Sequence, residues 1–191
     1  MSFLKELQKQ KEKLKETETI VTNVDGQRFV ENKNDVKSIT PNTYGFVVDT
    51  KPDNTPVEVI QNLYIGSQDC TAENILTNYS IKHVLSLGIS VPVLTDHKYV
   101  ECLDLPETNI KQILSECLPY IHKAVESKDN VLVHCNAGVS RTSMVAIAYL
   151  MHYKCMSYDN AYGLVKERRP AIRPNDGFKK QLRVMKPGEV I

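Results

Sequence analysis

The stretch VLVHCNAGVSRT, residues 131–142, constrains this chain more than any other. A short run of β-branched and aliphatic residues leads into His134 and Cys135, the chain turns at Gly138, and an apolar helical pattern begins at Arg141. This order predicts a strand, a loop and the first turn of a helix. Such a loop directs successive backbone N–H groups to one point, where the positive end of the helix dipole also lies. The stretch therefore predicts an anion site, and phosphate is the anion that suits it.

Cys135 and Arg141 add chemistry to this loop. A cysteine at the floor of a ring of N–H donors, beside a helix N-terminus and an arginine, is favoured as a thiolate and acts as a nucleophile. The planar guanidinium of Arg141 binds two phosphoryl oxygens at once and stabilises the charge that develops on them. Gly138 lets the backbone turn without a clash of a Cβ atom. We predict a hydrolase that attacks phosphorus through a cysteine.

Such a hydrolase also needs a carboxylic acid near the loop. The acid protonates the leaving oxygen and then activates the water that breaks the cysteinyl-phosphate. The acidic residues upstream are Asp96, Glu101, Asp104 and Glu107. Asp104 is the best placed, at the end of an expected strand where the LPETN loop begins, whereas Glu101 lies within that strand and Asp96 in a polar turn. We predict Asp104 as the acid, with Glu107 as the next choice.

Length and composition bound the class of protein. A chain of 191 residues suits one domain with an appendage. A net charge of +1 gives no reason to expect nucleic acid or a membrane surface as a partner. No apolar run approaches the roughly 18 residues that span a bilayer, so we expect a cytoplasmic location, with a nuclear one also open. Five cysteines without a CxxC pair argue against a disulfide scaffold or structural zinc.

The chain divides into an accessory segment, residues 1–56, and a main domain, residues 57–191. Residues 2–18 predict a largely solvated helix, and the runs around Asp25 and Gly26 predict a β-hairpin with a type I′ turn. Residues 33–56 are rich in turn formers and predict a linker, interrupted by an apolar patch at residues 44–48. The main domain alternates β-type runs with helical patterns, which predicts a sheet with helices on its faces.

The letters HCNAGVSRT match the His-Cys-x-x-Gly-x-x-Arg-Ser/Thr signature of the protein tyrosine phosphatase superfamily, and they resemble its small dual-specificity branch. LYIGSQD, HVLSL, LDLPETNI and RPNDGFKKQL extend the resemblance over about residues 57–185. The resemblance implies an α/β fold whose central, mixed but mainly parallel, five-stranded twisted sheet is flanked by helices, with no metal or cofactor. It also implies a shallow cleft open to phosphotyrosine, phosphoserine and phosphothreonine in phosphoproteins. The first functional hypothesis is therefore a phosphoprotein phosphatase that acts on protein kinases of a MAP-kinase pathway.

The resemblance also assigns roles to individual residues. It supports Cys135 as nucleophile, Arg141 as phosphate clamp and Asp104 as acid and base. Thr142 matches a hydroxyl residue that hydrogen-bonds the sulfur and eases its departure. His134 matches a residue that orients the cysteine and Asn175 one that braces the loop, although each also suits a purely local hydrogen bond. The phosphate loop itself would comprise Asn136, Ala137, Gly138, Val139, Ser140 and Arg141.

Other interpretations stay open from the sequence. The domain could bind phosphopeptides as a scaffold with little turnover, or hydrolyse a non-protein phosphate ester, although a loop interior without lysine disfavours phosphoinositides. Other Cys-x5-Arg enzymes are disfavoured: low-molecular-weight phosphatases and arsenate reductases carry the loop near the N-terminus, and a sulfurtransferase-like protein would lack the flanking similarities. Arg168, Arg169 and Arg173 are interpreted as a solvated charge run in preference to a site for a second phosphate.

Overall fold

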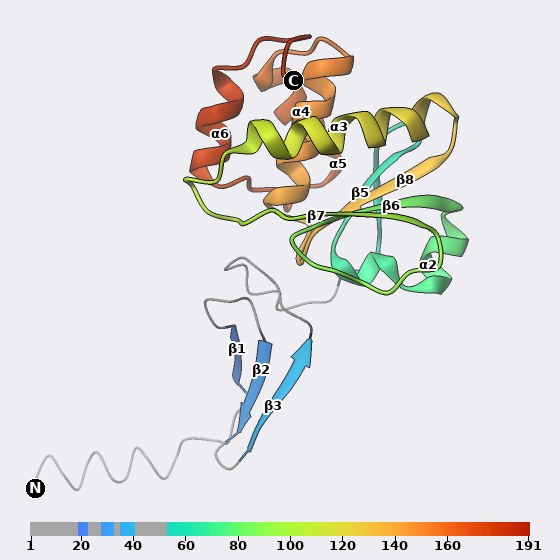
Figure 1. Ribbon diagram of the computed structural model, residues 1–191, viewed down its shortest axis with the longest axis vertical. Coiled ribbons are helices and arrows are strands. Elements are labelled where there is room, and N and C mark those ends of the chain that lie inside the picture. The colour runs from blue at the N-terminus through green and yellow to red at the C-terminus, as the bar shows by residue number, and fades with distance from the viewer. Residues whose placement is uncertain (1–18, 23–27, 33–34, 41–52) are drawn as a thin grey trace, which may run out of the picture.

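The computed structural model describes residues 19–22, 28–32, 35–40 and 53–191. Residues 53–191 contain a five-stranded sheet in the order β4-β5-β8-β6-β7 (Figure 1). The edge strand β4 runs antiparallel to β5, and the other neighbours are parallel. The predicted mixed, mainly parallel sheet is therefore confirmed. Its strands are β4 (Val57–Ile60), β5 (Leu63–Gly66), β6 (Ile81–Leu87), β7 (Asp96–Val100) and β8 (Asn130–His134).

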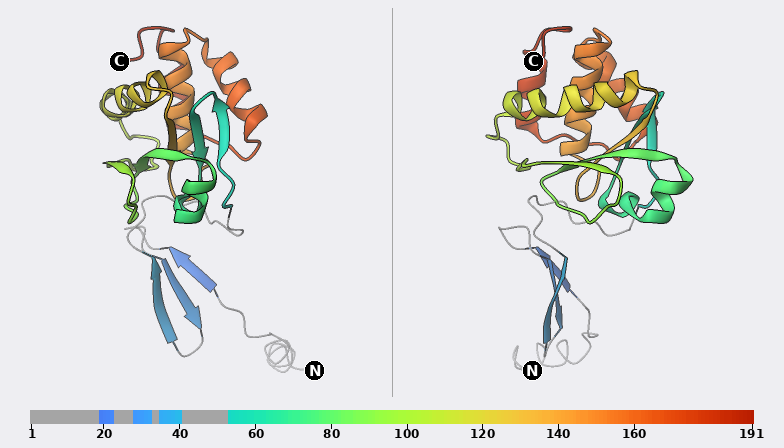
Figure 2. Two further views of the ribbon diagram at one scale, coloured as in Figure 1. Left: turned by 90° about the vertical axis from the view of Figure 1, so that its right-hand side faces the viewer. Right: turned by 45° about the vertical axis from the view of Figure 1, so that its right-hand side comes forward.

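Helices cover both faces of this sheet (Figures 1 and 2). On one side lie α3 (Ile110–Glu126), α4 (Arg141–Tyr153), α5 (Tyr158–Arg168) and α6 (Asp176–Arg183). On the other side lie the short 3-10 helix η1 (Gln68–Thr71) and α2 (Glu73–Asn78). A parallel sheet needs this cover on both faces, because its strands are apolar on both.

The main core lies between the sheet and α3, α4 and α5. Every residue of α4 from Arg141 to Met151 is buried, which explains why its sequence is apolar nearly all round. Helix α3 is instead amphipathic and directs Leu114, Leu118 and Ile121 inward. A smaller core under α2 joins its Leu76 to apolar side chains from the other face of the sheet. The nucleophile loop therefore connects a central strand to the most deeply buried helix.

Polar side chains cap the N-termini of three of these helices. Asn109 begins α3 by accepting from Lys111 N at 3.1 Å. Ser157 begins α5 and Asn175 begins α6 in the same way. These caps fix where the segments beside the nucleophile loop enter their helices.

The prediction that the strand before Asp104 extends to that residue is wrong. Strand β7 ends at Val100, so Glu101 follows the strand instead of lying within it, and Asp96 is its first residue instead of part of a turn. The reason is that β7 pairs only with β6, which ends at Leu87. The chain then turns at Gly88, where φ is +67°, and leaves β7 without a partner beyond Val100.

The other differences lie towards the N-terminus. The stretch QDCTAENILTNYS has helical spacing at Ala72, Ile75 and Leu76, but it forms η1 and then α2, and Ala72 lies exposed between them. Strands β1 (Thr19–Thr22) and β2 (Arg28–Asn32) pair antiparallel as the predicted hairpin requires. A third strand, β3 (Asp35–Thr40), pairs with β2 inside the segment predicted as a linker. The sequence did not predict this strand because its β-type pattern is short and begins among turn-forming residues.

Other sequence-based predictions fall outside the described residues: the helix over residues 2–18, the turn at Asp25 and Gly26, and the apolar patch at residues 44–48. None of the helices in the described ranges is long and apolar enough to cross a membrane. The carbonyl oxygen of Asp53 accepts a hydrogen bond from Ser67 Oγ at 2.6 Å. The folded unit therefore begins upstream of Val57, the predicted start of the main domain.

Candidate active site

The predicted phosphate loop lies at the edge of the sheet where the parallel strands end. Strand β8 ends at His134, and the neighbouring strands β5 and β6 end at Gly66 and Leu87. Open α/β sheets bind their ligands at this edge. The loop leaves β8 at Cys135 and enters α4 at Arg141, in the strand, loop and helix order that the sequence predicts.

Five consecutive carbonyl groups of the loop, from Asn136 to Ser140, are bound by groups outside its curve. The donors come from the segment after β5, from the end of α5, from the chain before α6 and from α4. The bonds are Gln68 N to Asn136 O (2.9 Å), Arg169 Nη2 to Ala137 O (3.2 Å), Arg169 Nε to Gly138 O (3.0 Å), Arg173 N to Val139 O (2.9 Å) and Met144 N to Ser140 O (3.0 Å).

These bonds determine where the loop N–H groups point. A planar trans peptide directs its N–H opposite to its C=O. With the carbonyls held outward, the N–H groups of residues 137–141 face the space enclosed by the loop. Cys135 begins the loop directly after β8 and is 2% exposed, so it lies at the base of that space. The loop therefore offers a ring of donors to a tetrahedral anion, at the positive end of the α4 dipole.

Gly138 is required at the tip of the loop. Its φ is +66°, and a Cβ atom there would overlap the backbone of Gly66 and Ser67. Glycine is the residue that adopts this conformation and tolerates this approach without cost. The geometry of Gly138 thus agrees with the prediction that a glycine lets the loop turn without a Cβ clash.

One nitrogen of the Arg141 guanidinium is held by backbone carbonyl groups at the end of β6 and after β7. Nη1 donates to Leu87 O at 3.0 Å and lies 3.5 Å from Cys102 O. Nε lies 3.9 Å from Asp104 Oδ2, and it is buried without a hydrogen-bond partner among the described residues. A buried donor left unpaired costs free energy, so a bound phosphoryl oxygen would satisfy it.

Asp104 lies beside the loop and is held there. Its side chain is 6% exposed. Oδ1 accepts from Ser140 Oγ at 2.6 Å and from Asn175 Nδ2 at 2.8 Å. Ser140 Oγ in turn accepts from Asn175 N at 3.1 Å. Asn175 therefore contacts the loop through its backbone and the carboxylate through its side chain.

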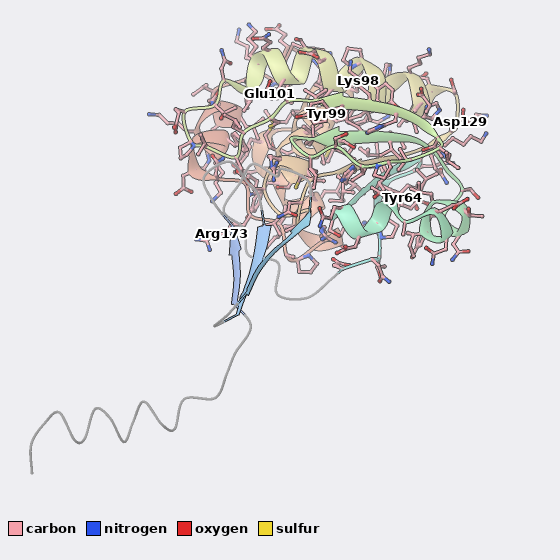
Figure 3. All side chains as sticks on the ribbon, turned by 60° about the horizontal axis from the view of Figure 1, so that its bottom comes forward. Tyr64, Lys98, Tyr99, Glu101, Asp129 and Arg173 are labelled. Atoms are coloured by element: carbon pink, nitrogen blue, oxygen red, sulfur yellow. The ribbon has the colours of Figure 1, made fainter. Side chains whose placement is uncertain are left out.

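The other predicted acids do not approach the loop in this way. Asp96 Oδ2 contacts His83 Nδ1 at 2.8 Å and accepts from the Tyr120 hydroxyl at 3.0 Å. Those contacts, His83 first, lower the pKa of Asp96. Glu101, labelled in Figure 3, and Glu107 are both exposed. Among the four candidates the geometry favours Asp104.

The segment that carries Asp104 is packed against α6. A Cβ atom at Gly177 would overlap the backbone of Pro106, so the start of α6 and the segment after Asp104 are in direct contact. Gln181 Nε2 donates to Thr108 O at 2.8 Å, and its Oε1 accepts from Ile110 N at 3.1 Å. One side chain of α6 thus binds the end of the turn that follows the acid and the first residue of α3. Sequence reasoning did not identify Gly177 or Gln181, because neither carries a reactive group.

His134 is fully buried beneath the loop. Its Nε2 lies 2.5 Å from Ser86 Oγ, and the same oxygen lies 2.8 Å from His97 Nε2. Burial lowers the pKa of His134 to about 3, although the backbone of Cys135 opposes this effect. The imidazole is therefore neutral at physiological pH, and it serves the site through its position and not through a charge.

Thr142 differs from its predicted arrangement. Its Oγ1 is buried and has no hydrogen-bond partner among the described residues, so the expected bond to the cysteine sulfur is not formed in this structure. The hydroxyl nevertheless follows Arg141 directly in the first turn of α4. A free hydroxyl at this position can still donate to a sulfur that carries negative charge.

Other buried cysteines differ from Cys135 in their surroundings. Burial raises the pKa of Cys70 to about 11 and that of Cys102 to about 12, and it also raises the pKa of Cys117. These thiols are therefore protonated at neutral pH and poor nucleophiles. Cys102 lies beside the site, because its carbonyl oxygen is 3.5 Å from Arg141 Nη1.

Arg169 is the main functional residue that sequence reasoning missed. The sequence favours a solvated charge run for Arg168, Arg169 and Arg173, but Arg169 is 4% exposed and binds two loop carbonyls. Arg168 and Arg173 are exposed, and Arg173 (Figure 3) holds Val139 through its backbone. A single sequence offers no signal for the difference, because a buried and a solvated arginine look alike before a proline.

No group of three or more histidine, cysteine, aspartate or glutamate side chains able to hold a metal ion occurs among the described residues. The loop, Arg141 and Asp104 offer nucleophilic attack by a thiolate, with an arginine, a ring of N–H groups and a carboxyl group around the reacting phosphorus. That combination is typical of cysteine-dependent phosphatases.

Comparison with known proteins identifies the family of this chain. The model of the dual specificity phosphatase catalytic domain matches residues 63–187. The chain therefore belongs to the dual specificity phosphatases, and it is a protein phosphatase of that family.

Individual relatives support the same family over most of the chain. Mouse dual specificity protein phosphatase 19 is 36% identical over 184 residues, which span 90% of this chain and 83% of the relative. A probable dual specificity protein phosphatase of Dictyostelium discoideum is 33% identical over 96% of this chain and 97% of its own length. The crystal structure of DUSP15 is 30% identical, with a TM-score of 0.65 over 69% of this chain and 86% of that chain.

The contact between Gly177 and Pro106 gives a first prediction. A Gly177→Ala substitution should displace the Pro106 backbone and with it Asp104, and lower kcat by roughly tenfold to a hundredfold, as misplacement of a reacting group by about 1 Å does. Gly163→Ala in α5 is the matched control, because a Cβ atom there meets nothing within 4 Å. Steady-state kinetics on a phosphopeptide measure the effect. Equal activity of the two variants would show that the α6 contact does not position the acid.

Proposed function

We propose that this chain hydrolyses phosphotyrosine and phosphoserine or phosphothreonine in phosphoproteins through a phosphorylated Cys135. The observation that carries the proposal is the outward binding of five successive loop carbonyls, which leaves N–H groups facing the space above the Cys135 sulfur. Those donors and the unpaired Arg141 Nε match the three outer oxygens of a phosphoryl group. Burial raises the thiol pKa of Cys70, Cys102 and Cys117, which makes them poor nucleophiles, and Cys135 is the cysteine at the start of the loop.

In the first step the Cys135 thiolate attacks phosphorus. The sulfur–phosphorus bond forms as the bond from phosphorus to the leaving oxygen breaks, and protonated Asp104 gives its proton to that oxygen. Arg141 and the loop N–H groups bind the oxygens on which charge develops. Ser140 and Asn175 hold the Asp104 carboxyl group toward the loop, so that it meets the leaving oxygen.

In the second step a water molecule attacks the phosphorylated cysteine. Asp104, now ionised, takes a proton from the water, the sulfur–phosphorus bond breaks, and inorganic phosphate and the thiolate are released. The unpaired Thr142 hydroxyl turns toward the departing sulfur and stabilises its charge. Neutral His134, buried directly before Cys135 and bound through Nε2 to Ser86 Oγ, orients the start of the loop.

The substrates that we propose are protein kinases of a MAP-kinase pathway, met in the cytoplasm and also in the nucleus. Membership of the dual specificity phosphatases supports a phosphoprotein substrate. We further propose that residues 57–191, extended upstream to Asp53, form the catalytic domain, and that the preceding segment is an accessory element.

The roles of Cys135 and Asp104 predict different losses for different leaving groups. Cys135→Ser should abolish turnover. Asp104→Ala should lower kcat/KM by about 10²- to 10⁴-fold on a phosphothreonine peptide, whose alkoxide needs a proton, and by less on p-nitrophenyl phosphate. Glu107→Ala is the matched control on the same segment and should keep full activity. If Glu107→Ala has the larger effect, the acid is Glu107; if both variants are fully active, a different group supplies the proton.

Substrate trapping tests the proposed partner. Asp104→Ala should retain a phosphorylated kinase of a MAP-kinase pathway from cell lysate, because binding through the loop persists while turnover slows. Orthovanadate, a tetrahedral competitor for the loop, should release that kinase, and Arg141→Ala on the same background should not retain it. A trap that retains only other phosphoproteins would contradict the MAP-kinase assignment, and retention that orthovanadate does not affect would contradict binding through the loop.

A further inference from the structure

Asp53 lies upstream of the family-matched region, which begins at residue 63, yet several contacts hold it in place. Its carbonyl oxygen accepts from Ser67 Oγ at 2.6 Å and from Cys70 Sγ at 3.3 Å. Its Oδ1 accepts from Thr55 N at 3.2 Å. Its other carboxylate oxygen, Oδ2, lies 2.7 Å from Arg169 Nη1. The residue is therefore fixed against the chain that follows β5, and its carboxylate is directed at Arg169.

Arg169 connects this carboxylate to the phosphate loop. Its side chain is 5% exposed and that of Asp53 is 40% exposed. Nε donates to Gly138 O at 3.0 Å and Nη2 donates to Ala137 O at 3.2 Å. Each of the three nitrogens of the guanidinium thus has its own partner, two in the loop and one in Asp53.

The Asp53 carboxylate stabilises the buried positive charge of Arg169. A buried charge without a partner is strongly destabilising, whereas a paired and hydrogen-bonded one is tolerated. The two loop carbonyls carry only partial charge, and Asp53 supplies the full negative charge. Because the guanidinium is planar and its donors form a rigid fork, fixing Nη1 also fixes the direction of Nε and Nη2.

We propose that Asp53 is a positioning residue of the active site, which holds Arg169 in the orientation that keeps the carbonyls of Ala137 and Gly138 turned away from Cys135. The N–H groups of Gly138 and Val139 belong to those same two peptides, so their inward direction depends on Asp53. The catalytic unit therefore includes a residue upstream of the family-matched domain. This inference rests on the proposed phosphate site.

The test compares full-length variants of two adjacent residues. Asp53→Ala removes the carboxylate, and Asn54→Ala is the matched control because Asn54 is exposed and neighbours Asp53 in the chain. We expect kcat/KM on p-nitrophenyl phosphate to fall about tenfold for Asp53→Ala, less than for the direct loss of an oxyanion donor, and to stay unchanged for Asn54→Ala. Asp53→Glu should recover part of the loss because it restores the charge.

Two further readouts separate positioning from a general loss of stability. Amide hydrogen exchange should become faster within residues 136–140 of Asp53→Ala and stay unchanged in residues 144–153 of the core helix α4. The inhibition constant of orthovanadate should weaken in parallel with kcat/KM. If Asp53→Ala does not fold, Asp53→Asn takes its place, because the amide keeps the acceptor oxygen without the charge.

The inference is overturned if the Asp53 variants keep wild-type kcat/KM and loop exchange, or if exchange increases equally throughout the domain. Hydrogen exchange also tests the role of Asp53 independently of phosphatase activity. A wild-type protein without phosphatase activity would contradict the function, but faster exchange of Asp53→Ala confined to residues 136–140 would still show that Asp53 holds the loop.

Discussion

The site depends on one constraint of the peptide bond: a trans peptide cannot direct its N–H and its C=O to the same side. The loop between β8 and α4 gathers donors around Cys135 only while its carbonyls are bound elsewhere. Four separate parts of the fold supply those bonds, through Gln68, Arg169, Arg173 and Met144. The helices and the sheet matter to the chemistry because they bring these four groups to the outside of one short loop.

A second set of contacts ties the acid to the same loop. Ser140 belongs to the loop, donates to Asp104 and accepts from Asn175. Asn175 also begins α6, the helix that packs against the turn after Asp104. The acid, the loop and α6 therefore share hydrogen bonds, so a shift of one changes the position of the others. A mobile acid loop would lack this fixed relation, and the two proton transfers need one carboxyl group in one place.

The sequence predicts the parts of the site that lie close together in the chain. The strand, loop and helix around Cys135 carry local signals, and Asp104 could be singled out by its place before a turn. Contacts made between distant segments left no such signal. Arg169 looked solvated, the end of β7 depends on where β6 stops, and Asp53 lay in a segment predicted as a linker. The predicted bond from Thr142 to the sulfur needed a side-chain geometry that the signature alone does not determine.

The central claim is that Cys135 carries the phosphoryl group between two steps that both use Asp104. The most direct measurement is to mix Asp104→Ala with excess p-nitrophenyl phosphate, quench with denaturant within the first turnovers, and locate the phosphoryl group by mass spectrometry of peptides. Because this leaving group needs little acid help while the second step lacks its base, one phosphoryl group should accumulate on Cys135. Its absence, or its presence on another residue, would contradict the mechanism.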